Sequence, residues 1–371
     1  MSSDASATPG IGSNQGTRQA ALRLAAGVTV CFAFVEALDW DATFLAPLLA
    51  ANMLVKLQRA PSLAQGLFVV VLIALSTSFV LVLTTAVMGK PAVLILTIAL
   101  LIYISFYAHR RGAPDLMTLL PQISAVSVPV IAVLSPEGAG AFAATLVMAG
   151  VVAVITVWAA FAAFPAPAAT AADASPAAGA EPPTAPTTAA RQALVDTLVL
   201  LPVLTWFILD ATEVAVVVLI VIVTVLRQTD PARGQRAALG LVFGNLIGGI
   251  AAAIAYNFVV LGHSFLFFVT VLLAASLAFA GRIVTAGDRA AVYAIALATF
   301  ILLLGLGLSP LPGGSGEAFT SRLLNVLLAS AYAIAGLSLL EPWRDATWSQ
   351  ATNSGALAAV GDGRAHPNQG V

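Results

Sequence analysis

The sequence predicts an all-α, polytopic membrane protein with about twelve transmembrane helices, built as two parallel six-helix repeats. Of its 371 residues, 60% are hydrophobic and only 9% are charged, whereas soluble domains carry about 45–50% apolar and about 25% charged residues. Twelve apolar segments approach the roughly 20 residues that a helix needs to cross the bilayer core. Short motifs in the first half of the chain also recur in the second half, 169 to 174 residues later.

The predicted spans form two groups of six, separated by a stretch rich in Ala, Pro and Thr. The first group comprises 18–38, 42–56, 63–88, 91–108, 116–134 and 139–164. The second group comprises 191–209, 211–226, 236–260, 264–281, 290–308 and 318–340. The second span of each group is short, so it is either a tilted half-span or one arm of a re-entrant hairpin.

The segments outside the spans predict the domain boundaries. We expect a disordered N-terminus over 1–16, a first repeat over 17–164, a flexible linker over 165–190, a second repeat over 191–343 and a disordered tail over 344–371. The linker has little apolar content beyond alanine, which is typical of a solvated segment.

The distribution of Lys and Arg predicts the orientation in the membrane. With the N-terminus inside, 14 of the 16 Lys and Arg residues fall on inner loops and helix ends, and only Lys90 and Arg322 fall outside. Cytoplasmic loops of bacterial inner-membrane proteins carry such an excess of positive charge. We therefore expect a multi-pass protein of the inner membrane with both termini in the cytoplasm.

The composition also excludes several classes of protein. A net charge of −1 leaves no basic surface for nucleic acid. The single cysteine, Cys31, can form no internal disulfide and is interpreted as a packing residue. We find no phosphate-binding loop, no nucleophile–base set and no histidines at metal-ligand spacing. The chain is therefore expected not to be an enzyme and to need no cofactor or metal.

The recurring motifs are short but collinear. They pair Arg18-Gln19-Ala20 with Arg191-Gln192-Ala193, Asp41-Ala42-Thr43 with Asp210-Ala211-Thr212, Pro61 and Gln65 with Pro231 and Gln235, and Leu134-Ser135-Pro136 with Leu308-Ser309-Pro310. Because six spans is an even number, both halves face the same way, related by a pseudo-twofold axis along the membrane normal. Halves of this kind usually enclose a site between them near the bilayer midplane.

Two charged residues inside predicted spans are the first candidates for a transport site. Arg23 and Asp196 differ by 173 residues, so they occupy equivalent places in the first and seventh spans. Charged groups inside a membrane span are costly, at least about 2.5–3.5 kcal/mol each near the centre. A pair of opposite charge facing the axis would offset part of this cost, and the carboxylate could take up a proton when an anion competes for the arginine. The alternatives, a snorkelling Arg23 and a locally paired Asp196, stay open.

Polar residues in other spans are further candidates. Arg322 and Asn325 share a face near the outer end of the twelfth span, where they would attract an anion at the exit, or Arg322 would simply pair at the interface with Glu317. Gln122 lies in the fifth span between two prolines, which predict either a cavity-lining, broken helix or a mere kink.

Two asparagines complete the candidate set. Asn245 lies within a series of glycines, Gly240, Gly244 and Gly248, whose four-residue spacing favours close helix packing. Asn52 lies in the short second span. Both are weaker candidates for contact with a substrate.

The twin six-span halves, opening with Arg18-Gln19-Ala20-Ala21-Leu22 and Arg191-Gln192-Ala193-Leu194, resemble the fusaric-acid-resistance or aromatic-acid-exporter superfamily. Within it, the chain is most similar to a compact bacterial branch of largely unassigned function. The resemblance covers about residues 17–343 and implies an efflux component that uses the proton motive force and works with a periplasmic adaptor protein. Better-known members carry a sizeable cytosolic domain, whereas here only a linker and a short tail are present, so any role of that domain does not transfer.

Together these observations predict a secondary efflux transporter for small amphipathic or aromatic organic anions, coupled to protons. The expected partners are the lipid bilayer, the organic anion, a periplasmic adaptor and further copies of the chain. Two alternatives stay open: an organic-anion channel, and a membrane scaffold or assembly partner that transports nothing.

Overall fold

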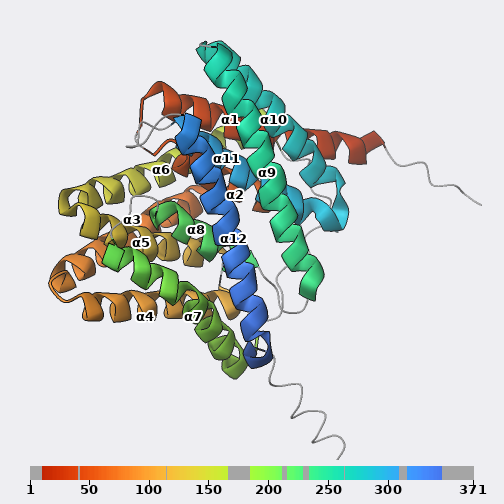
Figure 1. Ribbon diagram of the computed structural model, residues 1–371. Coiled ribbons are helices and arrows are strands. Elements are labelled where there is room, and N and C mark those ends of the chain that lie inside the picture. The colour runs from red at the N-terminus through yellow and green to blue at the C-terminus, as the bar shows by residue number, and fades with distance from the viewer. Residues whose placement is uncertain are drawn as a thin grey trace, which may run out of the picture.

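The computed structural model describes residues 11–40, 42–113, 115–165, 184–210, 215–228, 234–262, 264–308 and 316–344. Within these ranges the chain forms twelve α-helices, one short 3-10 helix and no strand, so the predicted all-α class is confirmed (Figure 1). The remaining residues, among them most of the predicted linker and the tail beyond Arg344, lie outside the described part of the chain.

The helices follow the predicted order. The first six are α1 (Ile11–Ala37), α2 (Leu45–Lys56), α3 (Leu63–Val87), α4 (Pro91–Arg110), α5 (Asp115–Leu134) and α6 (Pro136–Ala163). The second six are α7 (Pro186–Asp210), α8 (Ala215–Gln228), α9 (Gly234–Gly262), α10 (Phe265–Thr285), α11 (Ala290–Leu308) and α12 (Gly316–Arg344). The 3-10 helix η3 (Gly287–Arg289) precedes α11.

Nine of the described helices are long and apolar enough to cross a membrane: α1, α3, α4, α5, α6, α7, α9, α10 and α11. This finding supports the predicted multi-pass membrane protein. The second helix of each half is short, as expected: α2 has 12 residues and α8 has 14. At a rise of about 1.5 Å per residue, α2 is roughly 18 Å long, well below the roughly 30 Å of the bilayer core.

Local sequence explains where several helices begin. The side chain of Ser62 accepts a hydrogen bond from the Gln65 backbone amide, and the Gln65 side chain accepts one from the Ser62 amide, which forms a capping box before α3. The Ser135 hydroxyl accepts a hydrogen bond from the amide of Gly138, and Pro136 occupies the first position of α6, where proline costs no hydrogen bond.

Two helix starts, and the continuity of one helix, differ from the expectation. Residues 11–16, expected to be disordered, form the first turns of α1, and α7 begins at Pro186, inside the predicted linker. A hydropathy pattern marks only the apolar part of a helix, and both helices continue into polar sequence. The fifth helix is continuous through Pro121 and Pro129, so it is not broken.

Helix pairs within and between the halves define the architecture. Within the first half, α3 packs on α5 and α6, and α1 packs on α2 and α6; within the second half, α9 packs on α11 and α12, and α7 packs on α8 and α12. Between the halves, α1 packs on α10, α4 on α7, α2 on α11 and α5 on α8. In Figure 1, α3–α6 lie on one side, α9, α10 and α12 lie on the other, and α2 and α8 lie between them.

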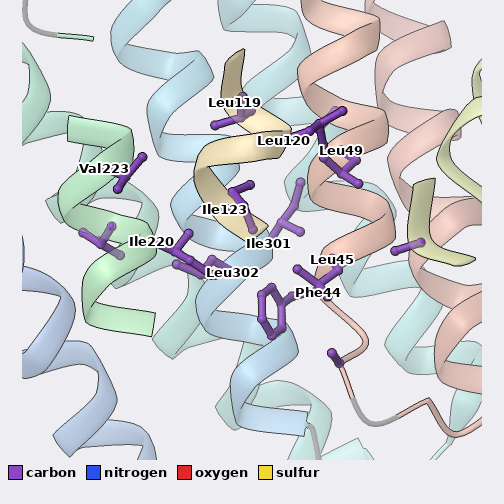
Figure 2. Close-up of a cluster of buried hydrophobic side chains, with 14 of the residues drawn as sticks. Phe44, Leu45, Leu49, Leu119, Leu120, Ile123, Ile220, Val223, Ile301 and Leu302 are labelled. Carbon is purple, nitrogen blue, oxygen red and sulfur yellow. The ribbon is translucent and has the colours of Figure 1, made fainter. Parts of the chain in front are cut away.

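A layer of large apolar side chains fills the centre, where α2, α5, α8 and α11 meet (Figure 2). We call this the central apolar layer; it comprises Phe44, Leu45, Leu49, Leu119, Leu120, Ile123, Ile220, Val223, Ile301 and Leu302, all of them buried. Figure 2 shows Leu119 near one end of the layer and Phe44 near the opposite end. The layer therefore forms part of the interface between the two halves.

The glycine series on α9 makes the close contact that its spacing predicts. A Cβ atom at Gly244 would lie 2.9 Å from the backbone oxygen of Val292, and one at Gly248 would collide with the backbone oxygen of Ala296. Both contacts are with α11, so the packing interpretation of these glycines is confirmed.

Candidate functional site

A buried polar cluster lies at one end of the interface between the halves. We call it the polar cluster and define it by His109 and Arg110 at the end of α4, Thr118 and Gln122 on α5, Asp196 on α7 and Arg227 at the end of α8. Because α4 and α8 end here and α5 begins here, these six side chains converge although they are far apart in sequence. The first four belong to the first half and the last two to the second.

Arg110 and Asp196 form an ion pair across this interface. Both Nε and Nη2 of Arg110 donate to Oδ2 of Asp196, at 3.0 and 2.7 Å, and Nη2 also donates to the backbone oxygen of Leu226 at 3.0 Å. The Asp196 side chain has no exposed surface and that of Arg110 is only 8% exposed. Solvent therefore screens this pair little, and it ties α4 directly to α7 and α8.

Arg227 forms the second set of contacts between the halves. Its Nη1 donates a short hydrogen bond to Oε1 of Gln122, and its Nη2 donates to the Thr118 hydroxyl at 2.9 Å. Nη2 also lies 3.4 Å from Nδ1 of His109, while Nε2 of His109 lies 3.3 Å from the backbone oxygen of Arg227. A guanidinium can only donate, so Nδ1 is the acceptor and the imidazole donates from Nε2.

Among the residues that the structure describes, the polar cluster carries more positive than negative charge. Two guanidinium groups and one carboxylate belong to it, and Arg110 and Arg227 lie close enough to repel each other. The exposed side chain of Lys56, at the end of α2, adds a third positive charge within range of Arg227. A concentration of cationic groups with little solvent around them favours an anionic ligand.

The side-chain amide of Gln122 is held in one orientation. Its oxygen must face Arg227, because the guanidinium has no acceptor to offer the amide nitrogen. Gln122 is completely buried, and its Nε2 finds no hydrogen-bond partner among the described residues. The cluster thus contains a buried donor group that an acceptor from outside the protein could satisfy.

The predicted pair of Arg23 and Asp196 does not form. Arg23 lies over the ring of Phe161, 4.1 Å from its centroid, and its Nη1 donates to the backbone oxygen of Phe164 at 3.4 Å. The reason is the helix arrangement: α1 packs on α10, whereas α7 packs on α4, which carries Arg110. An equal position along two repeats therefore does not make two residues neighbours, and the partner of Asp196 is Arg110.

Of the other predicted residues whose side chains the structure describes, only Gln122 belongs to the polar cluster. Asn52 donates to the backbone oxygen of Leu48 in its own helix at 2.9 Å. Asn245 donates to Ser330 at 3.0 Å and accepts from Thr299, in a buried network between α9, α12 and α11.

The pair predicted near the start of the twelfth span is only partly described. Asn325 is half-buried on α12, and the side chain of Arg322 lies outside the described residues, so its expected role as an exit site stays a prediction.

Sequence reasoning missed Arg110, Arg227, His109 and Thr118. Both arginines stand at helix ends, where they were counted among the cytoplasmic positive charges, and a basic residue there usually faces water. The one available signal was Asp196, a carboxylate inside a span that requires a cationic partner. Nothing in the sequence says which of the many basic helix ends supplies it.

Comparisons with known proteins place only part of the chain. Residues 20–160 match the family described as "Protein of unknown function (DUF2955)". The matched segment lies within the first six helices and covers less than half of the chain. No curated protein and no solved structure matches. The resemblance to the aromatic-acid-exporter superfamily therefore stays a prediction.

Proposed function

We propose that this protein is a secondary transporter of the bacterial inner membrane that exports small amphipathic or aromatic organic anions in exchange for protons. One observation carries the proposal: the polar cluster places two guanidinium groups and one carboxylate, all buried, where the two halves meet. Such a site favours an anion inside a membrane protein. The substrate class, the direction of export and the periplasmic adaptor come from the resemblance to the exporter superfamily.

We also propose that the halves are parallel repeats related by a pseudo-twofold axis. The pattern of helix contacts supports this, because exchanging α1–α6 with α7–α12 turns one set of contacts into another. The contact of α1 with α10 becomes that of α7 with α4, and the contact of α2 with α11 becomes that of α8 with α5. The family match supports it as well, because it lies within a single six-helix unit.

The orientation follows from the distribution of charge. The ends of α2, α4 and α8 carry Lys56, Arg110 and Arg227, and the positive-inside rule assigns such ends to the cytoplasm. Both termini are then cytoplasmic, and the polar cluster faces the side from which an exporter loads its substrate.

The ion pair suggests how proton and anion exchange are coupled. Asp196 is the proposed proton carrier, because a carboxylate whose bond to Arg110 is broken in this buried site binds a proton more readily. Only one of the two equivalent positions can act in this way, because the first half carries Arg23 where the second carries Asp196. The buried side chains of the central apolar layer pack between α2, α5, α8 and α11, so the proposed transport requires these helices to separate (Figure 2).

Transport by purified protein in proteoliposomes tests the proposal. We expect accumulation of radiolabelled benzoate or a related aromatic acid that depends on an imposed pH gradient. We expect Asp196→Asn to abolish this dependence and Asp196→Glu to retain it. Asp39→Asn serves as the control, because it removes an exposed carboxylate on the loop after α1.

The alternative functions predict different results in the same assay. Anion current that persists without a pH gradient and in Asp196→Asn would favour a channel. Absence of any substrate movement in folded protein would leave the scaffold as the better interpretation.

A further inference from the structure

We infer that Arg227 and Gln122 together form the subsite that holds the carboxylate group of the transported anion, an inference that rests on the proposed function. Two properties of Gln122 lead to it. Its side chain is completely buried, and its Nε2 has no acceptor among the described residues. A buried donor without an acceptor destabilises a structure, so a ligand that supplies the acceptor gains affinity from this group.

The orientation of the amide places this donor beside a positive charge. Oε1 of Gln122 accepts from Nη1 of Arg227, and Nε2 is bonded to the same carbon atom as Oε1. An acceptor that satisfies Nε2 therefore lies near the guanidinium group. A carboxylate suits this arrangement, because one oxygen can accept from the amide while the other accepts from Arg227.

The neighbouring side chains indicate what the rest of the ligand is like. Leu120 and Ile123 flank Gln122 on α5, and Val223 lies one turn before Arg227 on α8; all three belong to the central apolar layer (Figure 2). An apolar or aromatic body attached to the carboxylate would lie against this layer when α5 and α8 move apart. The structure thus assigns the charged group of the ligand to the polar cluster and its apolar body to the central layer.

The subsite is distinct from the ion pair of Arg110. Among its described contacts, the Arg227 guanidinium meets the neutral groups of Thr118 and His109, so a carboxylate that takes their place leaves the bond between Arg110 and Asp196 intact. Binding at Gln122 and Arg227 and proton exchange at Asp196 are therefore separable steps.

Equilibrium binding of radiolabelled benzoate to the full-length protein in phospholipid-free detergent tests the inference. Gln122→Glu removes the donor and adds a negative charge. We therefore expect the affinity for benzoate to fall by roughly tenfold to a hundredfold, the effect of a lost charge-assisted hydrogen bond. Gln122→Met removes the donor without adding charge and is expected to weaken binding about tenfold. Asn245→Asp is the matched control, because it puts the same carboxylate into a buried network that does not touch the cluster.

Each outcome decides the question. Loss of binding in both Gln122 variants, with wild-type melting temperatures and unchanged binding in Asn245→Asp, supports the subsite. Wild-type affinity in Gln122→Met overturns it, as does an absence of benzoate binding to the wild-type protein. Stabilisation by phosphatidylglycerol vesicles but not by benzoate also overturns it, since the acceptor would then be a lipid headgroup. Gln122-dependent binding without transport in proteoliposomes would keep the subsite and refute only the transporter.

Discussion

The ion pair between Arg110 and Asp196 allows a quantitative prediction. Both side chains are buried, and two hydrogen bonds from Arg110 converge on a single carboxylate oxygen. Removing one partner of a buried pair typically destabilises a protein by about 3–5 kcal/mol, because the other charge stays buried without compensation. Arg110→Gln and Asp196→Asn are each expected to lower the free energy of unfolding by about this amount.

The double variant separates this interaction from other effects of the two substitutions. Since the double variant leaves neither charge uncompensated, its cost should be smaller than the sum of the single costs by about 1.5–3 kcal/mol, the range for hydrogen bonds to charged groups. Unfolding in mixed micelles, followed by tryptophan fluorescence against denaturing detergent, gives the four free energies of the cycle.

A second cycle serves as the control. Arg23 contacts Phe161 and Phe164 rather than Asp196, so Arg23→Gln and Asp196→Asn should add. Additivity within about 0.5 kcal/mol for Arg110 and Asp196 would refute the pairing. Coupling between Arg23 and Asp196 instead would favour the pair that the repeat alone suggested.

Two further predictions concern packing and orientation. Gly248→Ala places a Cβ against the backbone of Ala296 and should lower the free energy of unfolding by about 1–3 kcal/mol. Gly140→Ala has open space around its Cβ, so it should leave the free energy of unfolding unchanged or raise it by about 0.5–1 kcal/mol. Equal melting temperatures of the two variants would contradict the close approach of α9 and α11. The orientation can be tested by labelling single cysteines with a membrane-impermeant maleimide in a Cys31→Ala background. Lys90→Cys should be labelled in cells whose outer membrane alone has been permeabilised, and Arg59→Cys should be labelled only after the cells are lysed. The reverse pattern would refute the proposed orientation.

The class of fold and most of the helices follow from the sequence because they depend on short-range properties. Each apolar stretch is long enough, or nearly so, to identify itself, and Ser62 with Gln65 or Ser135 with Pro136 marks a helix start within one turn. The short second helix of each half was likewise visible as a short apolar run. The starts of α1 and α7 were misplaced because polar residues can continue a helix beyond its apolar part.

The candidate site was only half visible in the sequence. Asp196 and Gln122 were recognisable because a carboxylate or an amide inside a span needs a reason to be there. Arg110 and Arg227 were not, because a basic residue at a helix end is ordinary in a membrane protein, and its long side chain can point either to water or into the bundle.

By itself, the sequence determined that the chain is helical, apolar enough for a membrane and rich in basic residues at particular helix ends, since hydropathy and charge are local quantities. Only the tertiary structure decided that α7 lies against α4 rather than α1, and so that Asp196 pairs with Arg110 while Arg227 reaches Gln122. The physical reason is that in a largely apolar bundle almost any helix face can pack on another. The choice of neighbour depends on the shapes of whole surfaces, such as the glycines of α9 against α11, and no short motif encodes such a surface.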